Sequence, residues 1–150
     1  MIYLATDHAG LALKEAIKRY LLDLGFQVED MGAHAFNKDD DYPDFIIPAA
    51  QKVAQDPDRH RGIVLGASGQ GEAICANKVK GIRAAVYYGG PLELAQRSRS
   101  HNNANILSLG ARYLTEDDAK QAVKLWLETG FDGGRHERRI EKITGFENRT

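Results

Sequence analysis

The chain has 150 residues, which is close to the usual size of one domain. Its 20 basic and 21 acidic side chains leave a net charge of -1, which argues against nucleic acid or an acidic membrane surface as a partner. A single cysteine, Cys75, excludes an internal disulfide and a four-cysteine zinc cluster, and the five histidines show no ligand spacing. No apolar run approaches the roughly 20 residues that span a bilayer, and no basic segment precedes the first apolar one. We therefore expect a cytoplasmic protein without a metal site.

Short apolar segments alternate with amphipathic ones along most of the chain. The apolar segments predict strands over residues 2–6, 26–29, 62–65, 82–87 and 104–109. Helices are expected over residues 13–24, from Asp44 as a cap after the polar loop 39–41, over 72–79, over about 91–100, and after Thr115, which forms a capping pair with Asp118. Each parallel strand must be reached by a crossover. The sequence therefore predicts an α/β fold, a three-layer, Rossmann-like single domain over 1–150 with a five-stranded parallel sheet.

Residues 131–150 depart from this alternation. After two glycines, basic and apolar side chains recur at helical spacing, which predicts a short basic amphipathic helix that needs a surface to pack on. Arg135 and Arg139 are four residues apart and would share one face of this helix. They could bind one phosphate together. A solvated basic face is the alternative.

Two polar segments follow predicted strands, at the edge where open parallel sheets bind ligands. Asp7 and His8 follow the first strand, although Asp7 could simply cap the next helix. A glycine-rich turn follows the third strand and is a candidate cradle for an anion or oxyanion. Its residues are Ala67, Ser68, Gly69, Gln70 and Gly71. It lacks the Lys-Ser/Thr ending of a P-loop and the position of a dinucleotide fingerprint, so nucleoside triphosphates and NAD are disfavoured. An ordinary tight turn before an acidic first helical turn at Glu72 is the alternative.

A third polar group flanks the fifth predicted strand. His101 and Asn102 precede the strand and Arg112 follows it, and we expect them near one edge of the sheet. A polar turn is the alternative. Cys75 lies three residues beyond Glu72 on the predicted helix and is expected to be a buried structural thiol.

Five segments, taken in this order, resemble the ribose-5-phosphate isomerase B family, which includes the galactose-6-phosphate isomerase subunits. They are DHAG at 7–10, DYPD at 41–44, GASGQG at 66–71, HNNAN at 101–105 and GGRH at 133–136. Many members place a catalytic cysteine where this chain has Gly66, and Cys75 cannot replace it. A second branch uses a glutamate just after the turn, which is Glu72 here.

The resemblance implies a cofactor-free isomerase that interconverts ribose 5-phosphate and ribulose 5-phosphate through an enediolate. It implies that Glu72 moves the carbon-bound proton, while His101 and Asp7 act as acid and base in ring opening. Ser68, with the turn at 67–71, would stabilise the oxyanion, and Asn102 would orient hydroxyl groups. The phosphate would be bound by four side chains, His8, Arg112, Arg135 and Arg139.

The resemblance also implies a homodimer, with a tetramer as the alternative, in which the segment from His101 to Arg112 completes the partner's site. Two other functions stay open. One is an isomerase for another phosphosugar, such as allose 6-phosphate, galactose 6-phosphate or a tetrose phosphate. The other is a phosphosugar-binding module without catalysis.

Overall fold

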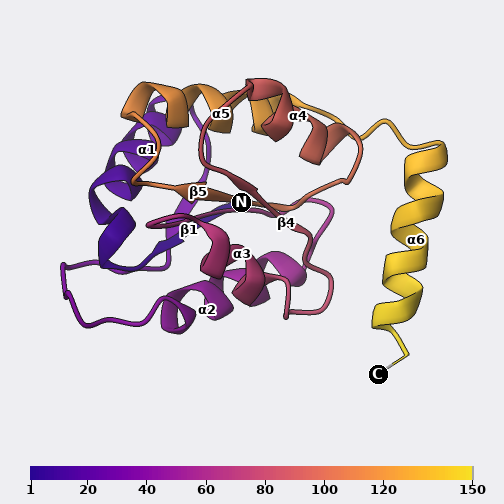
Figure 1. The fold of residues 1–150 in the computed structure, drawn as a ribbon, viewed down its shortest axis with the longest axis horizontal. Helices are drawn as coiled ribbons and strands as arrows, with labels where there is room; N and C mark the ends of the chain where they lie inside the picture. The colour runs from indigo at the N-terminus through magenta and orange to yellow at the C-terminus, as the bar shows by residue number, and fades with distance from the viewer. Residues whose placement is uncertain (150) are drawn as a thin grey trace.

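The computed structural model describes residues 1–149, which form a five-stranded sheet with helices on both faces (Figure 1). All strand pairs are parallel, in the order β2-β1-β3-β5-β4. The strands are β1 (Ile2–Thr6), β2 (Val28–Asp30), β3 (Arg61–Gly66), β4 (Ala84–Tyr87) and β5 (Ile106–Gly110). The predicted α/β class and the five-stranded parallel sheet are confirmed.

Three strands, β2, β4 and β5, begin two residues later than the sequence predicts. The cause is the same in each case, because the first apolar residue gives its backbone N–H to a local partner. Phe26 donates to Leu21 O, Ile82 to Val79 O and Ala104 to Ser98 O. These residues close turns after helices and do not pair in the sheet; Ile82 and Ala104 are buried there, whereas Phe26 is partly exposed.

Helices α1 (Leu11–Asp23), α4 (Leu92–Ser100) and α5 (Glu116–Glu128) cover one face of the sheet, and α2 (Pro43–Ala54) and α3 (Gln70–Ala76) cover the other (Figure 1). Successive strand residues point to opposite faces, so Leu4 joins the core under α1 and α5, and Ala5 joins the core under α2. Trp126 of α5 is fully buried in the first core. None of the helices within residues 1–149 is long and apolar enough to cross a membrane.

The helix starts follow the predicted capping residues only in part. Thr115 caps α5, since its side chain accepts a hydrogen bond from Asp118 N at 3.1 Å, as predicted. Asp44 was expected to cap α2, and this is wrong: Pro43 opens the helix, and Asp44 lies in its first turn. Proline suits the first helical position because it has no N–H to satisfy and a helix-compatible φ.

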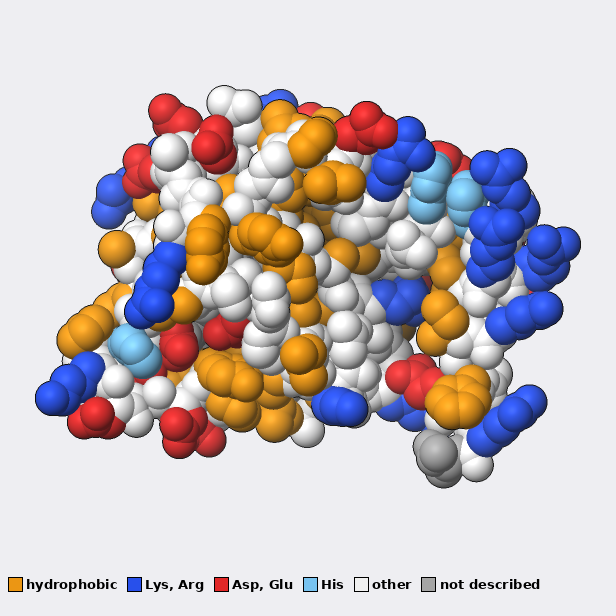
Figure 2. All heavy atoms as spheres, in the orientation of Figure 1, with side chains coloured by type: hydrophobic (Ala, Val, Ile, Leu, Met, Phe, Trp, Pro, Cys, Tyr) orange, Lys and Arg blue, Asp and Glu red, His pale blue; other side chains and the backbone are white. Residues whose placement is uncertain are grey.

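The predicted basic tail helix is confirmed as α6 (Arg135–Glu147), which stands beside the rest of the chain at the right of Figure 1. Ile140 is buried, but Ile143 and Phe146 are 57% and 70% exposed. A cavity of about 360 Å³ lies between α6 and the sheet edge, and Gly81 N donates to the Glu147 carboxylate at 3.1 Å. Lys and Arg side chains cluster along the outer side of this helix in Figure 2. The helix therefore presents apolar side chains that the described chain leaves exposed.

Candidate active site

The carboxyl ends of β1 and β3 lie side by side at the point where the strand order reverses. Thr6 is in register with Leu65, so Asp7 and Gly66 follow at the same edge of the sheet. Ligands of open α/β sheets bind in the crevice at such a point. The loop after β5 joins this edge, because Arg112 N donates to Ala67 O at 3.1 Å.

Asp7 both caps a helix and faces the candidate site. Its Oδ1 accepts a hydrogen bond from Ala9 N at 3.0 Å, which caps the single 3-10 turn His8–Gly10. Asp7 therefore does cap a helical turn, although the N-cap position of α1 itself is occupied by Gly10. The side chain is nevertheless buried near Glu72, and its charge acts on the Glu72 carboxylate. Capping fixes Asp7 in place and leaves its second oxygen for other contacts.

The Glu72 side chain is buried and lies directly over Gly66. A methyl group built on Gly66 would lie 1.8 Å from Glu72 Oε1, which is far inside contact distance. The carboxylate thus occupies the space that any side chain at position 66 would need. Burial raises the pKa of Glu72; a hydrogen bond from its own backbone N–H opposes this shift, and the negative charge of Asp7 adds to it. A carboxylate with a raised pKa is a stronger base.

A side chain of β5 fixes the conformation of the glycine-rich turn. Ser108 donates its hydroxyl to Gly69 O at 2.6 Å, and Gly69 adopts a left-handed φ of 80° that favours glycine. Ser68 Oγ accepts from Gln70 N at 3.3 Å at the start of α3. A methyl group on Gly71 would come within 2.9 Å of the Tyr42 ring, so Tyr42 forms a wall beside the turn.

His8 lies at the same edge, and its partner was not predicted from the sequence. Its Nδ1 is 2.6 Å from Asp40 Oδ1, and the positive charge of Arg112 acts on its imidazole. Asp40 belongs to a polar loop 32 residues away, and no motif or spacing marks it. Tyr42 lies in the DYPD segment, which could have indicated it.

Four predicted site residues lie at the opposite edge of the sheet: His101, Asn102, Arg135 and Arg139. The expectation that Arg112 shares an edge with His101 is therefore wrong. The two residues flank β5, whose five residues rise about 3.3 Å each, so roughly 15 Å separates its two ends. Within one chain, His101 and Glu72 cannot act on the same small sugar.

The residues at this second edge form a cluster around the start of α6. The His101 ring stacks on His136 with centroids 4.1 Å apart, and its Nε2 is 3.9 Å from Asp132 Oδ2. Desolvation lowers the pKa of His136, and the positive groups nearby, His101, Arg135 and Arg139, lower it further. Asn102 lines the cavity between α6 and the sheet edge. The guanidinium groups of Arg135 and Arg139 at the start of α6 make this end of the helix suited to an anion, beside the single carboxylate of Asp132.

Cys75 is half-buried and not fully buried as predicted. Burial raises the pKa of its thiol, and the charge of Glu72 raises it further. Since the thiolate is the nucleophile, this environment disfavours thiol chemistry.

Comparison with known proteins decides the family. The profile of the Ribose/Galactose Isomerase family matches residues 2–143. The chain belongs to this family. Ribose-5-phosphate isomerase B of Mycolicibacterium paratuberculosis is 44% identical over 147 residues, which cover 97% of this chain and 91% of the relative.

Solved structures give the same relationship. The crystal structure of ribose-5-phosphate isomerase B from Mycoplasma genitalium, with bound ribulose-5-phosphate, matches with a TM-score of 0.96 at 41% identity, over 99% of this chain and 97% of that one. The enzyme from Clostridium thermocellum matches with a TM-score of 0.91 at 44% identity, over 99% and 97% of the two chains. The family suggested by the five sequence segments is thus confirmed.

Proposed function

We propose that this protein interconverts ribose 5-phosphate and ribulose 5-phosphate. The observation that carries the proposal is the buried Glu72 carboxylate, which lies over Gly66 and beside the glycine-rich turn. A desolvated base next to converging amide groups is what proton transfer through an enediolate requires. The Mycoplasma genitalium relative, which binds ribulose-5-phosphate, supports this choice of substrate.

The reaction needs two proton transfers at the ring before the carbon chemistry. His101 protonates the ring oxygen, and Asp7 accepts the proton of the anomeric hydroxyl, so the C1–O bond to the ring breaks and an aldehyde forms. The two groups face different surroundings, since Asp7 is buried and His101 is only partly covered. This difference is consistent with separate roles, in which Asp7 is the base and His101 is the acid.

Glu72 then removes the proton from carbon 2. The electrons of that C–H bond form the C1=C2 double bond, and the aldehyde oxygen becomes the enediolate oxyanion. Glu72 returns its proton to carbon 1 while the hydroxyl proton on carbon 2 passes to the oxyanion on carbon 1, so that carbon 2 becomes the ketone and carbon 1 carries the alcohol. Ser68 and the amides of the turn at 67–71 stabilise the oxyanion, and one such donor is typically worth about 3 kcal/mol. The ring-opening transfers and the carbon-bound proton are thus assigned to side chains, and we propose no metal or organic cofactor.

We propose that two copies of the chain build each site. Glu72, Asp7 and Ser68 come from one subunit, and His101 and Asn102 come from the other. The phosphate is bound from both sides, by His8 and Arg112 and by the partner's Arg135 and Arg139. Within one chain, Glu72 and His101 lie at opposite edges of the sheet, so one chain alone cannot bring them to the same sugar. The exposed Ile143 and Phe146 of α6 also support this arrangement, because they would pack on the second subunit. A tetramer of such dimers is the alternative, and we place the enzyme in the cytoplasm.

A panel of phosphosugars tests this function. With a chelator present, we expect turnover of ribose 5-phosphate with a kcat/KM at least about tenfold above that for allose 6-phosphate, galactose 6-phosphate or erythrose 4-phosphate, since one missing or extra carbon group is worth about 1–3 kcal/mol. Turnover only of six-carbon or four-carbon substrates would assign another phosphosugar isomerase. Binding without turnover would assign a phosphosugar-binding module.

A further inference from the structure

His8 is held on two sides by the segment between β2 and α2 (residues 31–42). Asp40 Oδ1 lies 2.6 Å from His8 Nδ1 and also accepts the His8 backbone N–H at 3.1 Å. The Phe36 ring meets the imidazole edge to face, with ring centroids 5.9 Å apart. The orientation of His8 therefore depends on a loop that is distant in sequence.

The Asp40 carboxylate is in an unusual position for a loop residue. Its side chain is only 9% exposed. The second oxygen, Oδ2, is buried and accepts no hydrogen bond from any group within residues 1–149. Among the ion pairs of the described chain, His8 is the one cationic partner of Asp40. A nearly buried carboxylate with so few donors is costly unless a positive charge lies beside it.

We propose that Asp40 is a positioning residue that acts on the substrate through His8. It accepts a hydrogen bond from Nδ1–H and fixes the ring, so that Nε2–H is presented to the phosphate of the substrate. The inference rests on the proposed function, in which His8 is a phosphate ligand. It adds a residue that makes no contact with the sugar.

Three charged groups face the imidazole: Asp40, Asp7 and Arg112. The hydrogen bond to Asp40 is the largest influence and raises the pKa of His8, while desolvation opposes it. The negative charges of Asp7 and Asp40 raise this pKa, and Arg112 lowers it, with a net increase. A raised pKa keeps His8 charged to a higher pH, and the charge is lost as the pH rises through that pKa.

The KM for the phosphorylated substrate should therefore depend on pH, and Asp40 should set the pH at which it rises. Phosphate binds well while His8 is charged, and binding weakens once the imidazole is neutral. Removing the Asp40 charge lowers the pKa of His8, so this weakening begins at a lower pH. The value of kcat should change little, because Glu72 and His101 carry the chemistry.

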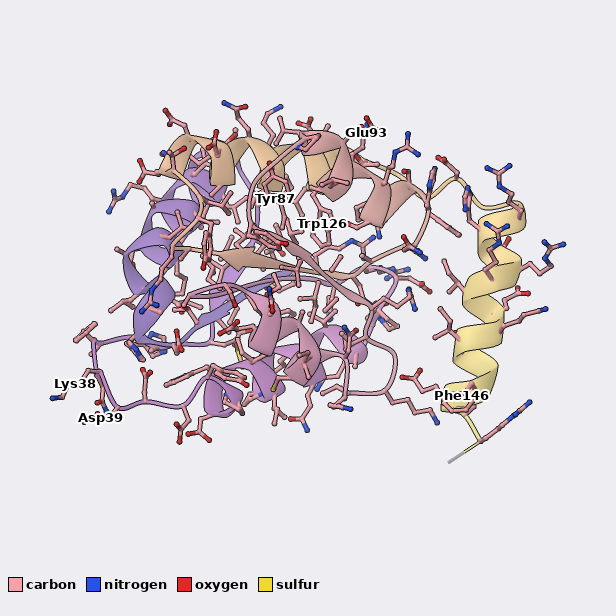
Figure 3. All side chains as sticks on the ribbon, viewed as in Figure 1. Lys38, Asp39, Tyr87, Glu93, Trp126 and Phe146 are labelled. Atoms are coloured by element: carbon pink, nitrogen blue, oxygen red, sulfur yellow. The ribbon has the colours of Figure 1, made fainter. Side chains whose placement is uncertain are left out.

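The variant Asp40→Asn tests this directly, with Asp39→Asn as its matched control. Asp39 is exposed at the tip of the same loop, beside Lys38 (Figure 3), so its loss changes the net charge equally. At pH 7.5, we expect Asp40→Asn to raise KM by about three- to tenfold with kcat within about twofold, since the ring loses its anchor and a charge-assisted hydrogen bond to phosphate is about twice as strong as a neutral one. At pH 5.5, its KM should approach that of the wild type. Asp39→Asn should match the wild type at both pH values.

An NMR titration of the His8 ring, without substrate, separates this inference from the proposed function. Asp40→Asn should lower the pKa of His8, and Asp39→Asn should not. An unchanged pKa would overturn the inference, as would a lowered pKa with a wild-type pH profile of KM. If the wild type does not isomerise ribose 5-phosphate, the proposed function fails. Calorimetry with inorganic phosphate still tests the inference, because it compares the phosphate affinity of the wild type with that of Asp40→Asn. If Asp40→Asn does not fold, Asp40→Glu replaces it: the displaced carboxylate should raise KM, and an unchanged KM would contradict the inference.

Discussion

Glu72→Gln is expected to lower kcat by about 100-fold to 10,000-fold, the usual contribution of a general base. Glutamine keeps the shape and the hydrogen-bonding oxygen of the side chain but cannot accept the proton from carbon 2. Steady-state kinetics with ribose 5-phosphate measure the effect. Because only one proton acceptor is removed, the affinity for substrate should change far less than kcat.

The stability of this variant provides a check on folding. Burial raises the pKa of Glu72 in the folded protein, so its ionised form at neutral pH costs stability. That cost is absent at low pH, where the carboxyl is protonated in both states, and it develops as the pH rises past the unfolded pKa. Glutamine removes the charge, so the Tm of Glu72→Gln at pH 7 should equal or exceed that of the wild type.

Cys75→Ala is the matched control for the base, since both side chains lie on α3. Its thiol has a raised pKa and is half-buried, so most of the activity should survive the substitution. Activity that disappears with Cys75, or that survives in Glu72→Gln, would refute the assignment of the base.

Gly66→Ala should cause a comparable loss of activity without altering any catalytic group. Its methyl group would overlap the Glu72 carboxylate, with 1.8 Å to Oε1 and 2.0 Å to Cδ. The carboxylate is the far end of a flexible side chain and can move away, so we expect a fall in kcat of about 100-fold or more from misplacement by an ångström or two. Gly66 ends a strand and has no left-handed φ, so alanine should be tolerated by the backbone.

A double variant distinguishes this mechanism from general damage to the site. If Gly66→Ala acts only by moving the carboxylate, adding it to Glu72→Gln should lower kcat little further. Fully additive losses would show that Gly66 acts on something other than Glu72. The same steric conflict means that a cysteine at position 66 would not fit beside Glu72 as it lies in this chain.

The fold was predictable because each strand and helix has its own local pattern. Leu4, Ile63 and Leu107 lie in short apolar runs, and helices separate them, so the parallel sheet followed from the crossovers. The starts of three strands were not predictable, since the backbone partners of Phe26, Ile82 and Ala104 depend on turns that apolar periodicity does not encode.

The candidate site was predictable only where chain order matches position in space. Asp7 and the turn before Glu72 follow strands directly, and the parallel register brings them together. His101 and Arg112 are close in sequence, yet the strand between them carries them to opposite edges. Asp40 lies in a loop that reaches His8 only after folding, so no spacing rule could identify it.

In the proposed dimer, Glu72 of one subunit and His101 of the other act on one sugar. Mixing inactive Glu72→Gln chains with inactive His101→Ala chains, with exchange of subunits, tests it most directly. Random exchange makes about half of the dimers mixed, and each mixed dimer has one intact site and one doubly defective site. About a quarter of the wild-type activity should therefore return. Mixed dimers that are verified by mass spectrometry and remain inactive would contradict the shared site.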